Sequence, residues 1–300
     1  MPQPRVISRN DVIAVHAGNA VTGEAPFWDA PRGALWWIDI QGQRLLAWYP
    51  QSAREEVRNL PLMQGLIASC ADGRLLLGIE DGLYPFDPAH GLQERLVAVE
   101  ADDPRTRLND GKPDPAGRLW FGTMERLGSG EPIGRLYRLD TDGRLDVIRQ
   151  NIRVPNAIAF APDGRTFYFA DSRERAVQAF AYDAAKGEIG SARIFVHYDE
   201  TEIPDGTCVD AEGALWIAVI GGSRIERRLA DGTLDTIVEL PVSRPTMPML
   251  GGADGRTLFV TSQRRFLSRE QLAREPLAGG LLAIRVEVPA APVFAVALGG

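Results

Sequence analysis

The sequence is poor in the residues that soft metals and nucleic acids need. It contains 2 cysteines and 3 histidines among 300 residues, and its formal net charge is −7. Because an acidic chain without clustered Lys and Arg repels phosphate backbones, we expect no nucleic-acid partner. All apolar runs are far shorter than the roughly 18 residues of a membrane-spanning helix, so we expect no membrane partner. Neither a G-x-S-x-G nor a G-x-x-x-x-G-K motif occurs, so the sequence carries no serine-nucleophile elbow and no phosphate loop.

The two cysteines, Cys70 and Cys208, both lie in apolar stretches. Buried free thiols in a reducing compartment are the favoured interpretation, and a disulfide between them is the alternative. Residues 1–20 lack the basic segment followed by an apolar one that marks a secretory signal. We therefore expect a cytoplasmic protein, and we expect it to be a monomer or a weak dimer.

The sequence is rich in a repeated pattern, in which a turn ending in glycine precedes a β-rich triplet. Examples are PRGALWWID and PAGRLWFGT. The repeat glycines are Gly33, Gly73, Gly117, Gly164, Gly213 and Gly255. Blades of four short antiparallel strands have periods of about 40–50 residues, which these spacings match. The sequence therefore predicts an all-β, six-bladed β-propeller, with residues 1–300 as a single domain.

Closure of such a ring requires its first and last strands to meet. The segment Asp11 to Val15 precedes the first repeat as a lone strand, and we expect it to complete the C-terminal blade and so remove two sheet edges. Residues 1–9 and the last few residues are expected to be loose. Ser268 and Gln271 form the pattern of a capping box, which predicts a short helix over 268–274.

Polar residues recur eight or nine positions before each repeat glycine. The six occupants are Glu24, Gln64, Asn109, Asn156, Asp205 and the apolar Met247. Inner strands of a propeller surround one axis, so these side chains are expected to face one another. Carboxylates and amide carbonyls without His or Cys suit a hard divalent cation such as Ca²⁺, Mg²⁺ or Mn²⁺. One Asn or Asp at a strand start is more often a cap, but four in register favour a metal site.

Other polar and aromatic residues have structural interpretations. Asp39 and Asp171 end second strands, where capping is the expected role. The tryptophans are mostly placed for blade cores, as Trp36, Trp120 and Trp216 illustrate. The run 140–143 resembles a calcium loop only faintly, and a hairpin turn is favoured there.

Four segments resemble one known family. They are GEAPFWD at 23–29, RLNDGKPDPAGRLWFGTM at 107–124, PNAIAFAPDGRTFYFADS at 155–172 and IPDGTCVDAEGALWIA at 203–218. In them the sequence resembles the family of senescence marker protein (regucalcin), gluconolactonases and bacterial sugar lactonases. That resemblance implies a six-bladed propeller with one divalent metal ion. By motif position it implies that Glu24, Asn156 and Asp205 bind the metal, and that Arg107, Asn109 and Asp110 contact the substrate.

The chain departs from the family pattern in one place. Some members have a substrate-contacting Glu shortly after the GTM motif, whereas this chain has Leu127 there, with Glu125 nearby. The segment 268–284 is more similar to the bacterial sugar lactonases than to the vertebrate proteins. Loop 125–133 and the helix near 268–274 are candidate rims that set substrate size.

The activity hypothesis is metal-dependent hydrolysis of an aldonolactone, for example xylono-, arabinono- or gluconolactone, to the aldonic acid. Asp205 is the candidate general base, because a metal-bound carboxylate can accept a proton from an adjacent water. The metal is left open among Ca²⁺, Mn²⁺, Mg²⁺, Zn²⁺ and Fe²⁺. Three alternatives remain: a metal-dependent phosphotriesterase or arylesterase, a non-catalytic calcium-binding propeller, and a protein-interaction platform.

Overall fold

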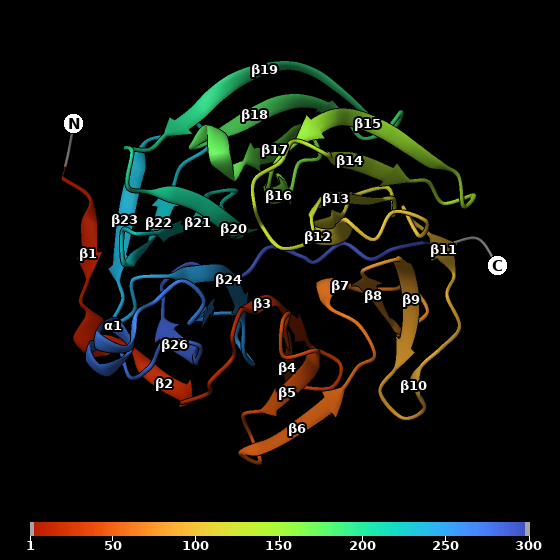
Figure 1. Ribbon diagram of the computed structural model, residues 1–300. Helices are drawn as coiled ribbons and strands as arrows, with labels where there is room; N and C mark the ends of the chain where they lie inside the picture. The colour runs from red at the N-terminus through yellow and green to blue at the C-terminus, as the bar shows by residue number, and fades with distance from the viewer. Residues whose placement is uncertain (1–2, 298–300) are drawn as a thin grey trace. The chain divides into compact units, whose positions relative to one another are not determined.

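The computed structural model describes residues 3–297, which form six β-sheets (Figure 1). These sheets are the blades of a β-propeller, which confirms the predicted fold class. The chain divides into two compact units. The first unit comprises the chain up to Pro61 together with Tyr198–Ala291, and the second comprises Leu62–His197 and the chain from Pro292 on. The single domain over residues 1–300 stays a prediction.

The second unit contains three consecutive blades, each running from an inner to an outer strand (Figure 1). Their strands are β7 (Gln64–Ser69), β8 (Leu75–Ile79), β9 (Gly82–Asp87), β10 (Gly91–Leu92) and β11 (Val97–Ala98); β12 (Thr106–Pro113), β13 (Leu119–Glu125), β14 (Gly134–Leu139) and β15 (Leu145–Ile152); and β16 (Pro155–Phe160), β17 (Thr166–Asp171), β18 (Ala176–Asp183) and β19 (Glu188–His197). Two short strands, β10 and β11, both pair with β9 in place of one regular fourth strand. The predicted hairpin turn at 140–143 lies between β14 and β15, with Gly143 at φ 86°.

The first unit contains the other three blades. Their strands are β3 (Gly23–Asp29), β4 (Ala34–Asp39), β5 (Arg44–Tyr49) and β6 (Arg54–Asn59); β20 (Ile203–Val209), β21 (Leu215–Ile220), β22 (Arg224–Arg228) and β23 (Leu234–Glu239); and β24 (Pro245–Gly251), β25 (Thr257–Ser262), β26 (Leu281–Arg285) and β2 (Ile13–His16). The helix α1 (Arg269–Arg274) lies between β25 and β26 in sequence, and Ser268 and Gln271 form its capping box, as predicted.

The predicted closure is confirmed, although its strand is shifted slightly from residues 11–15. β2 pairs antiparallel with β26, with Ile13 opposite Ala283. The expectation that residues 1–9 are loose is wrong for β1 (Arg5–Ile7), which pairs in parallel with β23. Ile7 packs against the blade core, and this burial holds the strand, whereas Arg5 forms only an exposed ion pair of 2.5 Å with Glu287. Residues 298–300 lie outside the described residues.

Aromatic side chains fill the blade cores. Trp36, Trp120 and Trp216 are almost completely buried, at 0–2% exposure, as predicted. In the second unit Trp120 contacts Phe167 with a ring distance of 5.1 Å. Asp39 ends β4 and its Oδ1 accepts hydrogen bonds from backbone N–H groups, as expected of a cap.

The cysteines are free thiols, as the sequence predicts. Cys208 is buried in the core of the first unit, whereas Cys70 is only partly buried. Burial raises the pKa of the Cys70 thiol to about 11, with a smaller contribution from the nearby Asp72 carboxylate. A thiol with so high a pKa is mostly protonated at neutral pH and reacts slowly.

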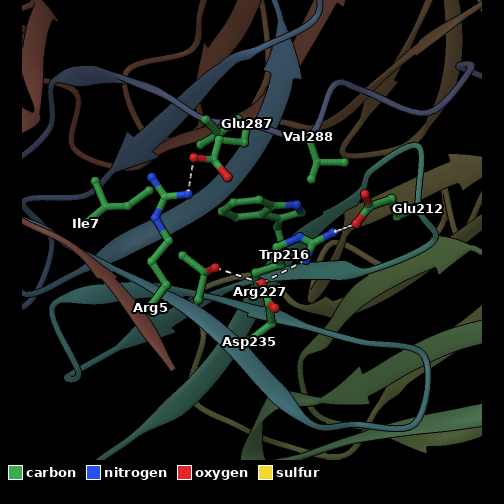
Figure 2. Close-up of a pocket in the computed structure, with 10 residues that line it drawn as sticks. Arg5, Ile7, Glu212, Trp216, Arg227, Asp235, Glu287 and Val288 are labelled. Carbon is green, nitrogen blue, oxygen red and sulfur yellow. Dashed lines mark hydrogen bonds and ion pairs between the residues drawn. The ribbon is translucent and has the colours of Figure 1, made fainter. Parts of the chain in front are cut away.

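A pocket of about 250 Å³ lies in the first unit beside β1 (Figure 2). Arg227, which is 5% exposed, binds carboxylates on three sides of its guanidinium. Its Nε donates to Asp210 at 2.7 Å, Nη1 to Asp235 at 2.8 Å and Nη2 to Glu212 at 2.6 Å. Asp210 also accepts a hydrogen bond of 2.9 Å from the indole of Trp216, so this network ties a blade core to its surface.

Candidate functional site

Every inner strand has an irregularity at the position that the sequence assigned to the site. The pairing of inner and second strands skips between Glu24 and Phe27, Gln64 and Leu66, Leu108 and Gly111, Asn156 and Ala159, Pro204 and Thr207, and Pro245 and Pro248. Such bulges leave residues unpaired and change the direction of their side chains. The register read from the repeat therefore coincides with a recurring feature of the backbone.

At two of these bulges a non-glycine residue has a left-handed backbone. Ala25 follows Glu24 with φ 48°, and Ala157 follows Asn156 with φ 53°. This conformation costs an alanine about 1–2 kcal/mol. Strained residues of this kind cluster where the fold holds a functional side chain in place, so both bulges are candidate parts of a site.

In the second unit the structure brings together three of the predicted residues. Asn109 donates through Nδ2 to Asn156 Oδ1 at 2.8 Å and to the Pro155 carbonyl at 2.9 Å. Arg107, which is buried, donates through Nη1 to Asn109 Oδ1 at 2.8 Å and to the Leu108 carbonyl at 2.9 Å. The guanidinium thus fixes one amide, and that amide bridges the inner strands β12 and β16.

Asn156 is also held from its other side. Its Nδ2 donates to Ser172 Oγ at 2.9 Å, so both ends of the amide are fixed. An amide oxygen has two lone pairs, and the hydrogen bond from Asn109 uses one. The orientation of Asn156 Oδ1 therefore fits an oxygen ligand of a cation, with Ser172 as the supporting partner.

The sequence reasoning missed Ser172, whose position follows from its neighbour. Asp171 ends β17 and accepts hydrogen bonds from the backbone N–H groups of Arg153 and Val154 at 2.8 and 3.1 Å. The predicted capping role of Asp171 is therefore confirmed. Ser172 follows this cap, directly after the strand that pairs with β16, and a serine at such a place is too common to be a signal.

Asp110 is buried, and its carboxylate contacts the backbone. It accepts hydrogen bonds from the N–H groups of Ile158 at 2.9 Å and Gly111 at 2.8 Å, and Lys112 Nζ lies 3.8 Å away. Burial raises the pKa of Asp110, although Lys112 and the two N–H groups oppose the rise. The contact with Ile158 fixes the bulge that carries Asn156. The predicted contact of Asp110 with substrate stays a prediction.

In the first unit, Glu24 and Asp205 occupy equivalent bulges of β3 and β20, and both are largely buried. Glu24 Oε2 accepts a hydrogen bond of 2.7 Å from the N–H of Ala25. β24 packs beside β3, because Thr246 Oγ1 donates to the Gly23 carbonyl at 2.6 Å. The ligand set of Glu24, Asn156 and Asp205 draws on both units and stays a prediction.

Among residues 3–297 no group of three His, Cys, Asp or Glu side chains is arranged to hold a metal. The predicted ligand set has only two carboxylates, and its third member, Asn156, is an amide. A site of this composition depends on the amide, which is why the orientation of Asn156 matters.

The carboxylate of Glu125 forms hydrogen bonds within the loop that follows β13. Glu125 accepts hydrogen bonds from the N–H groups of Leu127 at 2.9 Å and Ser129 at 2.6 Å. Burial alone would raise the pKa of Glu125, but these hydrogen bonds outweigh it and lower the pKa. Leu127 is 64% exposed. Glu125 therefore stabilises the loop, and Leu127 presents an apolar side chain to solvent.

No helix in the described part of the chain has the length and apolar character to cross a membrane.

Comparisons with known proteins identify the fold and the family. The solved structure of a calcium-binding regucalcin from Agrobacterium tumefaciens superposes with a TM-score of 0.91 at 30% identity, over 97% of this chain and 99% of that one. It supports the propeller fold over nearly the whole chain.

The sequence comparisons agree. The 6-deoxy-6-sulfogluconolactonase of Pseudomonas putida is 34% identical over 285 residues, which cover 92% of this chain and 96% of that protein. Regucalcin of Gallus gallus is 32% identical over 268 residues, covering 87% and 90%. A family model described as the SMP-30/Gluconolactonase/LRE-like region matches residues 22–264. The chain therefore belongs to the SMP-30/gluconolactonase/LRE-like family.

Proposed function

We propose that this protein is a hydrolase that opens a sugar lactone, an aldonolactone, to the aldonic acid. The observation that carries the proposal is the hydrogen-bonded set of Arg107, Asn109 and Asn156 at the inner-strand bulges. Membership of a family that includes a sulfogluconolactonase supports the same class of substrate. Lactone hydrolysis adds water across one ester bond, and the products are a carboxylate and a hydroxyl group of one molecule.

We further propose that Glu24, Asn156 and Asp205 hold one divalent cation. Two carboxylates balance the charge of the ion, and the three ligands are oxygens, which hard cations prefer. The chemistry that such an ion supplies when bound is polarisation of the lactone carbonyl. The name of the Agrobacterium relative, a calcium-binding protein, supports a divalent cation.

The side chains themselves have separate tasks in this proposal. Asp205 accepts the proton of the attacking water as the new C–O bond forms, and the ring oxygen takes up a proton as its bond breaks. Arg107 and Asn109 orient the sugar through its oxygens. Asp110 holds the backbone at Ile158 and so positions Asn156.

The test compares two identical chemical changes in one blade. Asp205→Asn is expected to lower kcat by at least about 100-fold, since a positioned general base contributes 10²–10⁴-fold. Asp235→Asn, in the pocket of Figure 2, is the matched control and should stay near wild-type activity. The assay is hydrolysis of xylono-, arabinono-, glucono- and galactonolactone after chelation and re-addition of single metals. Near wild-type turnover by Asp205→Asn would contradict the role.

The same assay distinguishes lactone hydrolysis from the alternative functions. An aryl ester and an organophosphate in the panel report an arylesterase or phosphotriesterase. Tight binding of Ca²⁺ in calorimetry, with no turnover of any lactone or ester, would indicate a calcium-binding propeller instead. Each result favours one of these functions, because the substrates and the metal are added separately.

A further inference from the structure

Arg244, Arg265 and Phe266 form a cationic and aromatic rim. It lies at one end of the blade that contains β24, β25, β26 and β2. β24 begins where β25 ends, because Pro245 pairs with Ser262. The residue before β24 is Arg244, and its carbonyl accepts a hydrogen bond of 3.1 Å from the N–H of Gln263. Arg244 and the segment after Ser262 therefore lie at the same end of the blade as the bulge of β24.

Arg244 contributes a partly buried guanidinium to this rim. Its Nε is buried and has no hydrogen-bond partner among residues 3–297. Burial lowers the pKa of Arg244, while Asp205 and Glu275 act in the opposite direction and Arg265 adds to the lowering. The carboxylate of Asp205, the candidate general base, therefore acts electrostatically on this guanidinium.

Phe266 supplies an exposed aromatic face for two arginines. The Arg244 guanidinium carbon lies 5.4 Å from the centre of the Phe266 ring, and that of Arg265 lies 4.6 Å from it. Phe266 is 65% exposed and has a left-handed backbone with φ 68°. A bulky residue in this conformation is strained, so the fold holds the ring open to solvent beside two positive charges.

Glu275, whose carboxylate acts electrostatically on Arg244, forms its hydrogen bonds with Ser243. Glu275 Oε2 accepts hydrogen bonds from the backbone N–H of Ser243 at 2.7 Å and from its hydroxyl at 3.0 Å. In contrast to Arg227, which binds three carboxylates in the same unit, Arg244 has a buried N–H without an acceptor. Buried donors that lack an acceptor are costly, and an anion from outside would remove that cost.

We propose that Arg244, Arg265 and Phe266 form a subsite for an anionic substituent of the lactone, such as a carboxylate, sulfonate or phosphate. An arginine fork recognises the oxygens shared by these groups, and the Phe266 ring contacts both guanidinium groups. Because the subsite serves the lactonase site, it rests on the function proposed above. It selects a lactone that carries negative charge away from the ring carbonyl.

The first experiment compares neutral and anionic lactones. Wild-type protein is assayed with gluconolactone, with glucarolactone, which carries a carboxylate, and with 6-phosphogluconolactone. Arg244→Gln should lower kcat/KM for the anionic lactones by about 10- to 100-fold, as expected for one lost charge-assisted hydrogen bond. Its effect on gluconolactone should stay below about threefold. Arg285→Gln, the same change at an exposed arginine at the opposite end of this blade, where Arg285 pairs with Thr257, is the control and should alter neither.

The second experiment measures binding without turnover. Calorimetry with the intact protein compares 6-phosphogluconate and glucarate with gluconate, whose far end is neutral. The two acids that carry a second charge at the far end should bind more tightly, and Arg244→Gln should remove the difference. Arg265→Gln should reduce it, which tests the subsite independently if the first variant folds poorly.

The outcomes separate the two proposals. Arg244-dependent preference for the two acids with a charged far end, with no lactone hydrolysed, supports the subsite and refutes the lactonase. Turnover of neutral lactones with equal binding of all three acids refutes the subsite and leaves the lactonase intact. Equal loss of activity on neutral and anionic lactones in Arg244→Gln also refutes the subsite.

Discussion

Replacing Arg227 with methionine removes the centre of the ion network in Figure 2. Asp210, which is 0% exposed, would keep a buried charge without its guanidinium partner. Loss of one partner of a buried ion pair costs about 3–5 kcal/mol. Asp210 retains hydrogen bonds from Trp216 and from the backbone N–H groups of Glu212 and Ala214. We therefore expect the lower end of the range, a loss of about 3 kcal/mol.

Thermal unfolding followed by circular dichroism measures this loss. About 3 kcal/mol corresponds to a midpoint lowered by about 5 °C, because the entropy of unfolding is about 2.1 cal/mol/K per residue and the chain has 300 residues. Arg285→Met is the matched control, because Arg285 also bonds a carboxylate twice, that of Asp254 at 2.6 and 2.9 Å, but on the surface. Exposed ion pairs contribute little, so its midpoint should stay near wild type. Equal midpoints for the two variants would refute the reasoning.

The pH dependence of the stability difference between wild type and Arg227→Met gives a second readout. Burial alone would raise the pKa of Asp235, but the hydrogen bonds from Arg227 and Thr236 outweigh it and lower the pKa. A carboxylate with a lowered pKa in the folded state stabilises the fold above its unfolded pKa of about 3.9. That contribution is lost as the pH falls. The difference in unfolding free energy between wild type and Arg227→Met should therefore be largest above about pH 5 and should become smaller below about pH 4.

Three further predictions address the site, a thiol and the helix. Ser172→Ala removes the partner of Asn156 Nδ2, so calorimetry should show about 10- to 100-fold weaker binding of Ca²⁺ or Mn²⁺. Unchanged affinity would exclude this supporting role. Cys70, whose pKa is raised from 9.0 to about 11, should react with iodoacetamide at pH 8 about 100-fold more slowly than an ordinary thiol; a normal rate would contradict its burial. Ser268→Ala breaks the capping box and should destabilise α1 by about 1 kcal/mol, seen as faster amide exchange at Gln271. Exchange as slow as in the wild type would contradict it.

The fold was readable from the sequence because its signal repeats. Each repeat places one glycine turn before an apolar strand, so errors in a single blade did not affect the count. β2 was readable as a strand because it is apolar and lies before the first repeat. β1 was not, because three residues carry no periodicity, and its parallel pairing with β23 depends on a tertiary contact. The Arg5–Glu287 ion pair joins residues far apart in the chain, which no local pattern reveals.

The positions of the inner-strand bulges were readable from the sequence, whereas the contacts of the side chains there were not. Alignment of the repeats located Asn109 and Asn156, and the structure joins them by a hydrogen bond. The contact between Asp110 and the N–H of Ile158 spans 48 positions, so nothing in the sequence near Asp110 announces it. Ser172 was likewise hidden, because a serine after a strand is common. The left-handed backbone of Ala157 was also unforeseen, since alanine has no intrinsic preference for it.

The pairing of β2 with β26 has a consequence for synthesis on the ribosome. β2 is translated before every other strand of its sheet, and its hydrogen-bonding partner is translated after all of them. During that interval the nascent chain carries an unpaired strand, which is an edge that other chains can join. The blades from β7 to β19 come from one continuous stretch and need no such wait. A chain stalled before Leu281 should therefore aggregate through its N-terminal segment, and chaperone binding to nascent chains should persist until β26 emerges.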